Sequence, residues 1–248
     1  MINTQQISLY IVSALAVLVI LSIHEFSHGY VAYKLGDPTA KYQGRLTLNP
    51  MKHLDPWGAL CMVFFHFGWA KPVPIDLRYF KKPKRDFALV AIAGPISNLV
   101  LAFLGAFLYL GFERIAMQIP IPNSFVYNLI FYTLYFLLAF HQINLGLAIF
   151  NLIPVPPLDG SRLLFSILPD RLYYKFLRHE RTIYLIMLGW LFLGSALSRF
   201  LLSFPFVADV PVLSTIARIF SLSGLIGTVA DWLSELMLSF WRLLPFLR

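Results

Sequence analysis

Four long apolar segments constrain the fold of this 248-residue chain more than any other feature. They cover residues 7–33, 87–112, 126–152 and 183–204. A helix needs about 20 mostly apolar residues to cross the hydrocarbon core of a bilayer, and each segment meets or approaches that length. Only 13% of the residues are charged, whereas soluble domains average about 25%. The sequence therefore predicts an α-helical, multi-pass integral membrane protein.

The first apolar segment and the C-terminal residues each allow two interpretations. A removable signal peptide begins with basic residues and ends at a small-residue cleavage pattern. The opening sequence MINTQQ has no basic residue and no such pattern follows, so we expect the first segment to remain. Residues 213–244 form a less uniform fifth segment, whose polar face includes Asp231 and Glu235. That segment either spans the membrane or lies along its surface, giving one or two additional C-terminal membrane helices.

The distribution of basic residues predicts the topology. Residues 58–69 are too few for an ordinary span and favour a re-entrant element. If they do not cross, residues 34–86 and the loop around residues 162–181 share one side and hold most of the Lys and Arg, while the opposite loops hold only Arg114. The positive-inside rule then places the basic side in the cytoplasm, with the cell membrane as the expected location. Because these cations flank apolar segments instead of forming one face, the net charge of +8 does not predict nucleic-acid binding.

The basic insert between the first two spans carries a different pattern. In YQGRLTLNP and MVFFHFGWAKPVPID, Gly and Pro punctuate short runs with β propensity, which predicts hairpin-like strands. Such backbone is tolerated at membrane depth only when it packs on protein or lines a wet cavity. We expect an extended substrate to add to a strand edge at residues 43–48 or 62–67.

The first span ends with the sequence HEFSH, which contains His24, Glu25 and His28. On a helix the two histidines lie one turn apart on the same face, where both can bind one metal ion. Glu25 is rotated off that face but can reach a water on the ion, the arrangement used in zinc hydrolysis. The alternative is a pair of hydrogen-bonded core histidines. An acid inside the membrane costs about 2.5–3.5 kcal/mol on insertion scales, which favours a functional role.

A catalytic zinc requires a third protein ligand, and the stretch NLIPVPPLDG, residues 151–160, offers Asp159. Its three prolines block helix continuation, so the third span should unwind just before Asp159. That residue either binds the metal or caps the following short helix, and the pattern favours neither.

A further polar motif, AGPISN, residues 93–98, lies near the start of the second span. Asn98 either donates a hydrogen bond to substrate or to a developing oxyanion, or bonds a neighbouring helix beside the close-packing residue Gly94. With a non-crossing insert, HEFSH, AGPISN and PPLDG all reach the same side of the membrane.

In this order and on these segments, the motifs resemble the site-2 protease family of intramembrane zinc metalloproteases, in a compact form without PDZ-like or CBS nucleotide-sensing domains. The resemblance covers residues 7–170. It implies a core of three membrane helices within residues 1–170, with residues 171–248 as further helices of the same domain, and a membrane-inserted β-hairpin in the insert. It assigns the zinc ligands and the reacting groups to these positions: His24, His28 and Asp159 for zinc, Glu25 as acid/base, and Asn151 near the oxyanion.

Family members cut single-pass membrane proteins within or near the bilayer, so such substrates and Zn²⁺ are the expected partners. Two other functions are weighed against this one: a zinc-binding membrane scaffold that does not cut, and a metal transporter. A scaffold does not need the base Glu25, and the inverted repeat and paired broken helices of transporters are missing from the sequence. The substrate and the oligomeric state are not determined by the sequence.

Overall fold

The computed structural model describes residues 4–65, 69–121, 123–169, 171–172, 175, 178–219 and 221–247. Four of its helices are long and apolar enough to cross a membrane: α1 (Thr4–Lys34), α5 (Pro83–Ala116), α6 (Ser124–Leu152) and α9 (Glu180–Leu202). They coincide with the four predicted segments to within a few residues. The α-helical membrane fold is thereby confirmed.

The ends of these helices follow from local sequence. α5 begins at Pro83, in the first turn, where the missing N–H of proline costs nothing. α6 begins after Asn123, whose side chain accepts a hydrogen bond from the backbone N–H of Val126. It ends at Leu152, because Pro154 cannot continue the helix.

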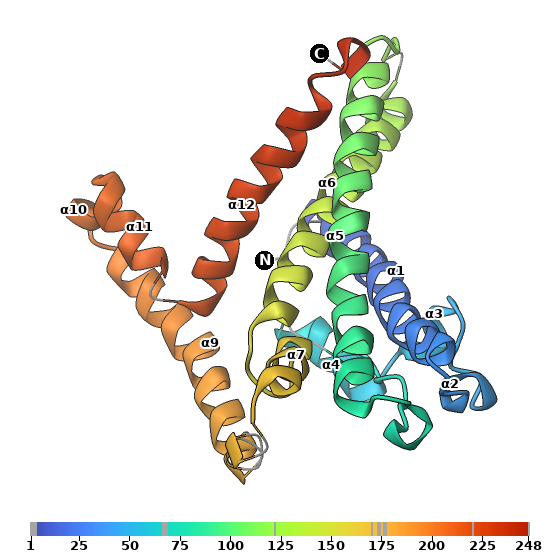
Figure 1. Cartoon of the computed structure of the whole chain (residues 1–248). Coiled ribbons are helices and arrows are strands. Elements are labelled where there is room, and N and C mark those ends of the chain that lie inside the picture. Colours follow the sequence, from blue (N-terminus) through green and yellow to red (C-terminus); the bar gives the residue numbers. More distant parts are fainter. Residues whose placement is uncertain are drawn as a thin grey trace.

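Helix α5 is the centre of the bundle and packs against α1, α6 and α7 (Asp159–Ile167) (Figure 1). Its buried positions include the small residues Ala91, Ala102 and Ala106. Without a hydrophobic driving force between helices in lipid, small side chains that allow close van der Waals packing hold such helices together. This packing lets α7 reach the end of α1.

The end of α1, the start of α5 and the end of α6 lie at the same end of the bundle, the lower end in Figure 1. The insert therefore returns to the side on which α1 ends. Within it, α4 (Pro56–Phe65) has ten residues and is too short to span a bilayer. This is the non-crossing arrangement that the charge pattern predicts.

The structure of the insert does not confirm the predicted hairpin-like strands. Its described residues form α2 (Thr39–Tyr42), α3 (Pro50–His53), α4 and η1 (Leu77–Tyr79), with one isolated bridge between Leu54 and Ala70. Residues 43–48 contain no strand, residues 62–65 belong to α4, and residues 66–67 lie outside the described part of the chain. Prolines at the starts of α3 and α4 preset helical backbone and outweigh the β propensity of the neighbouring residues.

The C-terminal part contains α10 (Pro205–Ala208), α11 (Pro211–Ile219), α12 (Leu222–Trp241) and η2 (Pro245–Leu247) in addition to α9. α12 lies against α5 and α6, whereas α9 packs mainly on α11 and α12 (Figure 1) and meets the end of α6 through the apolar cluster of Met187 and Phe150. α11 and α12, which meet at a bend, count as a fifth span if the pair is taken as one. One or two additional membrane helices were expected, and this is confirmed.

Candidate metal centre

His24 and His28 lie in the last third of α1 and face the interior of the bundle. They are 5% and 4% exposed, and their Nε2 atoms are 3.1 Å apart. Their spacing of four residues on a helix produces this proximity. Two buried ring nitrogens that meet this closely can serve one metal ion.

Asp159 is the first residue of α7 and reaches both histidines. Its Oδ2 lies 3.3 Å from Nε2 of His24 and 3.2 Å from Nε2 of His28. Leu158 occupies the N-cap position of α7, so Asp159 is not the capping residue. The three ligand atoms all lie within 4.8 Å of one another. Residues separated by about 130 positions thus form one cluster.

The interruption of the helix between α6 and α7 brings Asp159 to this position. After Leu152 the backbone turns, and α7 starts directly against the end of α6. Gly160 permits this approach, because a Cβ at that position would overlap the carbonyl groups of Leu152 and Ile153. The prolines end α6, and the glycine lets the next helix return to it.

Gly94 of α5 closes the other side of the cluster. A Cβ at Gly94 would overlap Nε2 of His28 and Cε1 of His24. The glycine therefore allows the α5 backbone to approach the two imidazoles directly. In the motif AGPISN, the residue with the most direct contact to the site is this glycine.

The three side chains fit a zinc ion. Nδ1 of His28 donates to the carbonyl of Val90 at 2.7 Å, which leaves the Nε2 lone pair for a metal. Burial raises the pKa of the Asp159 carboxyl, but its contacts with His24 and His28 lower it more, so its pKa lies below the ordinary range. Two neutral imidazoles and a carboxylate are donors of the type that zinc prefers, and three protein ligands leave a position open.

Glu25 is held beside the cluster by the insert. Its Oε2 accepts a hydrogen bond of 2.8 Å from the backbone N–H of Val73. Val73 belongs to residues 71–76, an irregular segment that we call the strap. Nη2 of Arg45 donates to the carbonyls of Lys71 and Pro72, at 2.6 and 3.2 Å. A buried guanidinium thus positions the strap, and the strap positions the carboxylate of Glu25.

The two asparagines proposed as oxyanion donors are close in sequence to residues of the site, Asn98 to Gly94 and Asn151 to Asp159. Neither makes a described contact with the three ligand residues. Asn98 lies one turn beyond Gly94, is fully buried, and neither of its amide atoms has a hydrogen-bond partner among the described residues. Asn151 lies in the last turn of α6 and is half-buried. Their catalytic roles stay predictions.

The structure adds site residues that the sequence did not reveal. Arg45 was one of many basic residues in the insert, and no spacing pattern distinguished it. Val73 and Val90 act through backbone atoms, which leave no signal in the identity of the side chain.

The other four histidines were expected to be packing, interface or loop residues. His53 and His141 are buried and hydrogen-bonded to backbone carbonyls. His179 lies at the start of α9, and His66 lies outside the described residues.

Comparison with known proteins identifies the protein family to which the chain is similar. The sequence model of peptidase family M50 matches residues 12–194. A Bacillus subtilis (strain 168) protein named "Putative zinc metalloprotease YwhC" is 43% identical over 174 residues, which are 70% of this chain and 77% of that protein. "Putative zinc metalloprotease Rip2" of Mycolicibacterium smegmatis is 33% identical over 144 residues, 56% of this chain and 51% of that protein. The comparison with solved structures gave no match.

The chain therefore belongs to peptidase family M50, the site-2 protease family that the motifs resemble. The family is zinc-dependent, and its relatives named above are zinc metalloproteases by name. Zinc is accordingly the cofactor of this membrane protein.

Proposed function

We propose that this protein is an intramembrane zinc endopeptidase that hydrolyses peptide bonds of membrane-spanning substrates within or near the bilayer. The observation that carries the proposal is the convergence of His24, His28 and Asp159 at one end of the membrane helices, with Glu25 next to the first ligand. Metal binding alone needs no carboxylate at that position, whereas hydrolysis needs a base.

The residues divide the chemistry as follows. His24, His28 and Asp159 would hold zinc, which would act as a Lewis acid toward a water and a peptide carbonyl. Glu25 takes the proton of the attacking water and returns it to the leaving amine. Asn151 and Asn98 are the proposed donors to the charge that develops on the carbonyl oxygen. The hydrogen bond from the backbone N–H of Val73 in the strap holds the carboxylate of Glu25 in place.

A cavity of about 830 Å³ offers a route for a substrate segment. One wall is a stripe of α1 from Gln6 to Ser22, about 24 Å at 1.5 Å per residue. The other walls come from α6, from the insert and from Leu191 of α9, and the lining is mostly apolar. The stripe ends two residues before His24, so a single-pass helix lying along α1 reaches the metal centre where it must unwind.

The lining of this cavity includes His53, which offers a hydrogen-bond acceptor suited to unwound backbone. Nε2 of His53 donates to the carbonyl of Thr47 at 2.7 Å, which makes Nδ1 the acceptor. That Nδ1 is buried and has no partner among the described residues. A backbone N–H released from a substrate helix is the donor we propose for it.

The proposed orientation puts the metal centre toward the cytoplasm, in the cell membrane. The end of the bundle that carries the cluster also carries the insert, with ten Lys and Arg between residues 34 and 86. Basic loops face the cytoplasm by the positive-inside rule. Water reaches the centre most easily from this end.

The test uses the purified full chain in lipid vesicles with a fluorogenic membrane-spanning peptide. Glu25→Gln should lower cleavage by about 10²–10⁴-fold with the zinc content unchanged, and Glu113→Gln at the far end of α5 is the matched control. Full cleavage by Glu25→Gln would contradict the assignment of the base. Zinc flux without cleavage would indicate the transporter, and substrate binding by wild type and variant alike without cleavage would indicate the scaffold.

A further inference from the structure

A pair of hydroxyl groups interrupts the apolar wall of the cavity beside α1. Oγ of Ser13 in α1 and Oη of Tyr135 in α6 lie 3.1 Å apart, and both residues line the cavity of about 830 Å³. The neighbouring lining residues of α1 include Ile11, Ala14 and Val17, whose side chains have no polar atom. The two hydroxyls are therefore a polar point on an apolar surface within the membrane.

This hydroxyl pair has one hydrogen more than it uses. A hydroxyl carries one donor and two acceptor sites, and a single hydrogen bond between two hydroxyls uses only one of their two hydrogens. Whichever oxygen donates, the other keeps its O–H, and neither Ser13 nor Tyr135 makes a further hydrogen bond within the described part of the chain. A donor without an acceptor is unfavourable in apolar surroundings, so the pair favours a ligand that supplies an acceptor.

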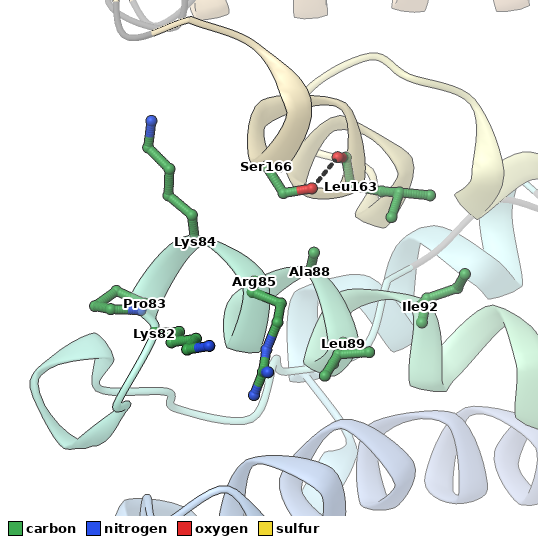
Figure 2. Close-up of a pocket in the computed structure, with 9 residues that line it drawn as sticks. All are labelled: Lys82, Pro83, Lys84, Arg85, Ala88, Leu89, Ile92, Leu163 and Ser166. Atoms are coloured by element: carbon green, nitrogen blue, oxygen red, sulfur yellow. Dashed lines mark hydrogen bonds between the residues drawn. The ribbon is translucent and has the colours of Figure 1, made fainter.

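Other serines that line cavities already use their hydrogen. In the smaller pocket between the start of α5 and α7, the hydroxyl of Ser166 donates to the carbonyl of Leu163, the bond drawn as a dashed line in Figure 2. Ser22, which lines the cavity beside α1, donates to a backbone carbonyl of its own helix at 2.6 Å. Ser13 instead contacts Tyr135 across the interface of α1 and α6.

A carboxamide matches this pair better than an apolar or a charged side chain does. Its carbonyl oxygen accepts the remaining O–H, and its NH₂ group donates to a lone pair of the same hydroxyls. An apolar side chain offers neither group. A charged side chain would find no counter-ion, because the lining residues of α1 and α6 carry no charge, and an unpaired charge within a membrane is costly.

We infer that the hydroxyl pair of Ser13 and Tyr135 selects membrane-spanning substrates that carry a Gln or Asn on the helix face turned toward α1. The inference rests on the proposed function, in which a substrate helix lies along α1 and is cut at the metal centre. The pair thereby acts in specificity, at a distance from the reacting groups.

The position of the pair along α1 predicts the position of the carboxamide in the substrate. Ser13 precedes His24 by 11 residues, which is about 16 Å along a helix. A substrate that stays helical over this distance has its carboxamide about 11 residues from the bond that is cut. If its last three residues are extended, the separation falls to about 7 residues.

The experiment measures how fluorescent membrane-spanning peptides bind to the full chain with Glu25→Gln in lipid vesicles. This substitution removes the proposed base, so affinity is measured without cleavage. In a series of peptides, one Gln replaces Leu at successive positions. Leu and Gln have similar helix propensities, so the exchange tests hydrogen bonding and not helix unwinding. The best Gln peptide should bind about three- to tenfold more tightly than the Leu peptide.

Two double variants in the same background assign the preference to the pair. Ser13→Ala/Tyr135→Phe removes both hydroxyls and should bind the Gln and Leu peptides equally. The matched control Ser8→Ala/Tyr132→Phe makes the same chemical changes on α1 and α6 at positions that do not line the cavity, and it should keep the preference. A merely structural pair would weaken the binding of both peptides alike and leave the ratio of their affinities unchanged.

Zinc content and unfolding midpoints confirm that each variant is folded. Equal binding of the Gln and Leu peptides by the chain with both hydroxyls would overturn the inference. A preference that survives the loss of both hydroxyls, or that is lost equally in the control, would also overturn it. If the chain with Glu25 intact cuts neither peptide while the preference in binding remains, the proposed function fails and the selection by the hydroxyl pair stands.

Discussion

The bundle around α5 and the C-terminal helices are both apolar and helical, yet they are held together by different means. In the bundle, buried polar side chains connect helices across the interior, at the metal cluster and at His141. Helix α9 instead exposes large apolar residues, with Leu193 73% and Ile186 67% exposed. In the helices that carry chemistry, buried polar contacts thus add to close packing, whereas α9 is held by a buried apolar cluster that includes Met187 and Leu222.

Helix α12 shows how the two regions are connected. Nδ1 of His141 in α6 donates to the carbonyl of Ala102 in α5 at 2.7 Å, so its Nε2 accepts from the hydroxyl of Ser234 in α12 at 2.8 Å. Gln142 in turn donates to Ser234 at 3.1 Å. Three helices meet at one neutral histidine, which anchors α12 to the bundle.

The largest expected difference between the regions concerns glycine. Gly94→Ala places a methyl group on the histidines of the cluster, so zinc affinity should fall by about 10–100-fold and cleavage with it. At Gly189 of α9 an added Cβ meets nothing within 4 Å, and Gly189→Ala should retain zinc. Metal analysis of both purified proteins checks the comparison. Equal zinc contents would mean that the cluster tolerates displacement of α5.

A smaller effect is expected at the strap. Arg45→Ala leaves the carbonyls of Lys71 and Pro72 unpaired and loosens the backbone that holds Glu25. We expect kcat to fall by about tenfold with zinc content unchanged, since a misplaced base loses transition-state stabilisation. Lys52→Ala, which removes an exposed cation from α3 of the same insert, is the control. Hydrogen exchange of the Val73 amide should accelerate in the first variant only.

If the strap were merely structural, Arg45→Ala would lower the unfolding midpoint and leave kcat of the folded fraction unchanged. Arg45→Lys supplies a single ammonium in place of the planar guanidinium. It should restore part of kcat, because an ammonium still donates to a carbonyl.

The smallest expected effect concerns the two serine contacts of α12. Ser234→Ala leaves the buried Nε2 of His141 without its donor and should cost about 1 kcal/mol of unfolding free energy. Ser223 pairs with Ser195 of α9 at an exposed position, and Ser223→Ala should cost less than about 0.5 kcal/mol. Thermal unfolding in one detergent measures both. A larger loss from Ser223→Ala would reverse the assignment of which contact anchors α12.

The helices were predictable because membrane spans depend on length and apolarity alone. In lipid every backbone polar group must be satisfied within the segment, so an apolar run of sufficient length has only one structure available. The insert was less predictable, since its short runs combine β propensity with helix-starting prolines such as Pro50 and Pro56. Within so few residues, capping and packing outweigh propensity. The domain boundary expected near residue 170 stays a prediction.

The sequence by itself determined the four spans, the non-crossing insert and the spacing that puts His24 and His28 on one face, because helical periodicity and bilayer thickness are local constraints. Only the tertiary structure decided that Asp159 meets those histidines instead of capping α7, that Gly94 admits the backbone of α5, and that Arg45 reaches Glu25 through the strap. These contacts join residues far apart in the chain through close approach and backbone hydrogen bonds, and no local pattern encodes either.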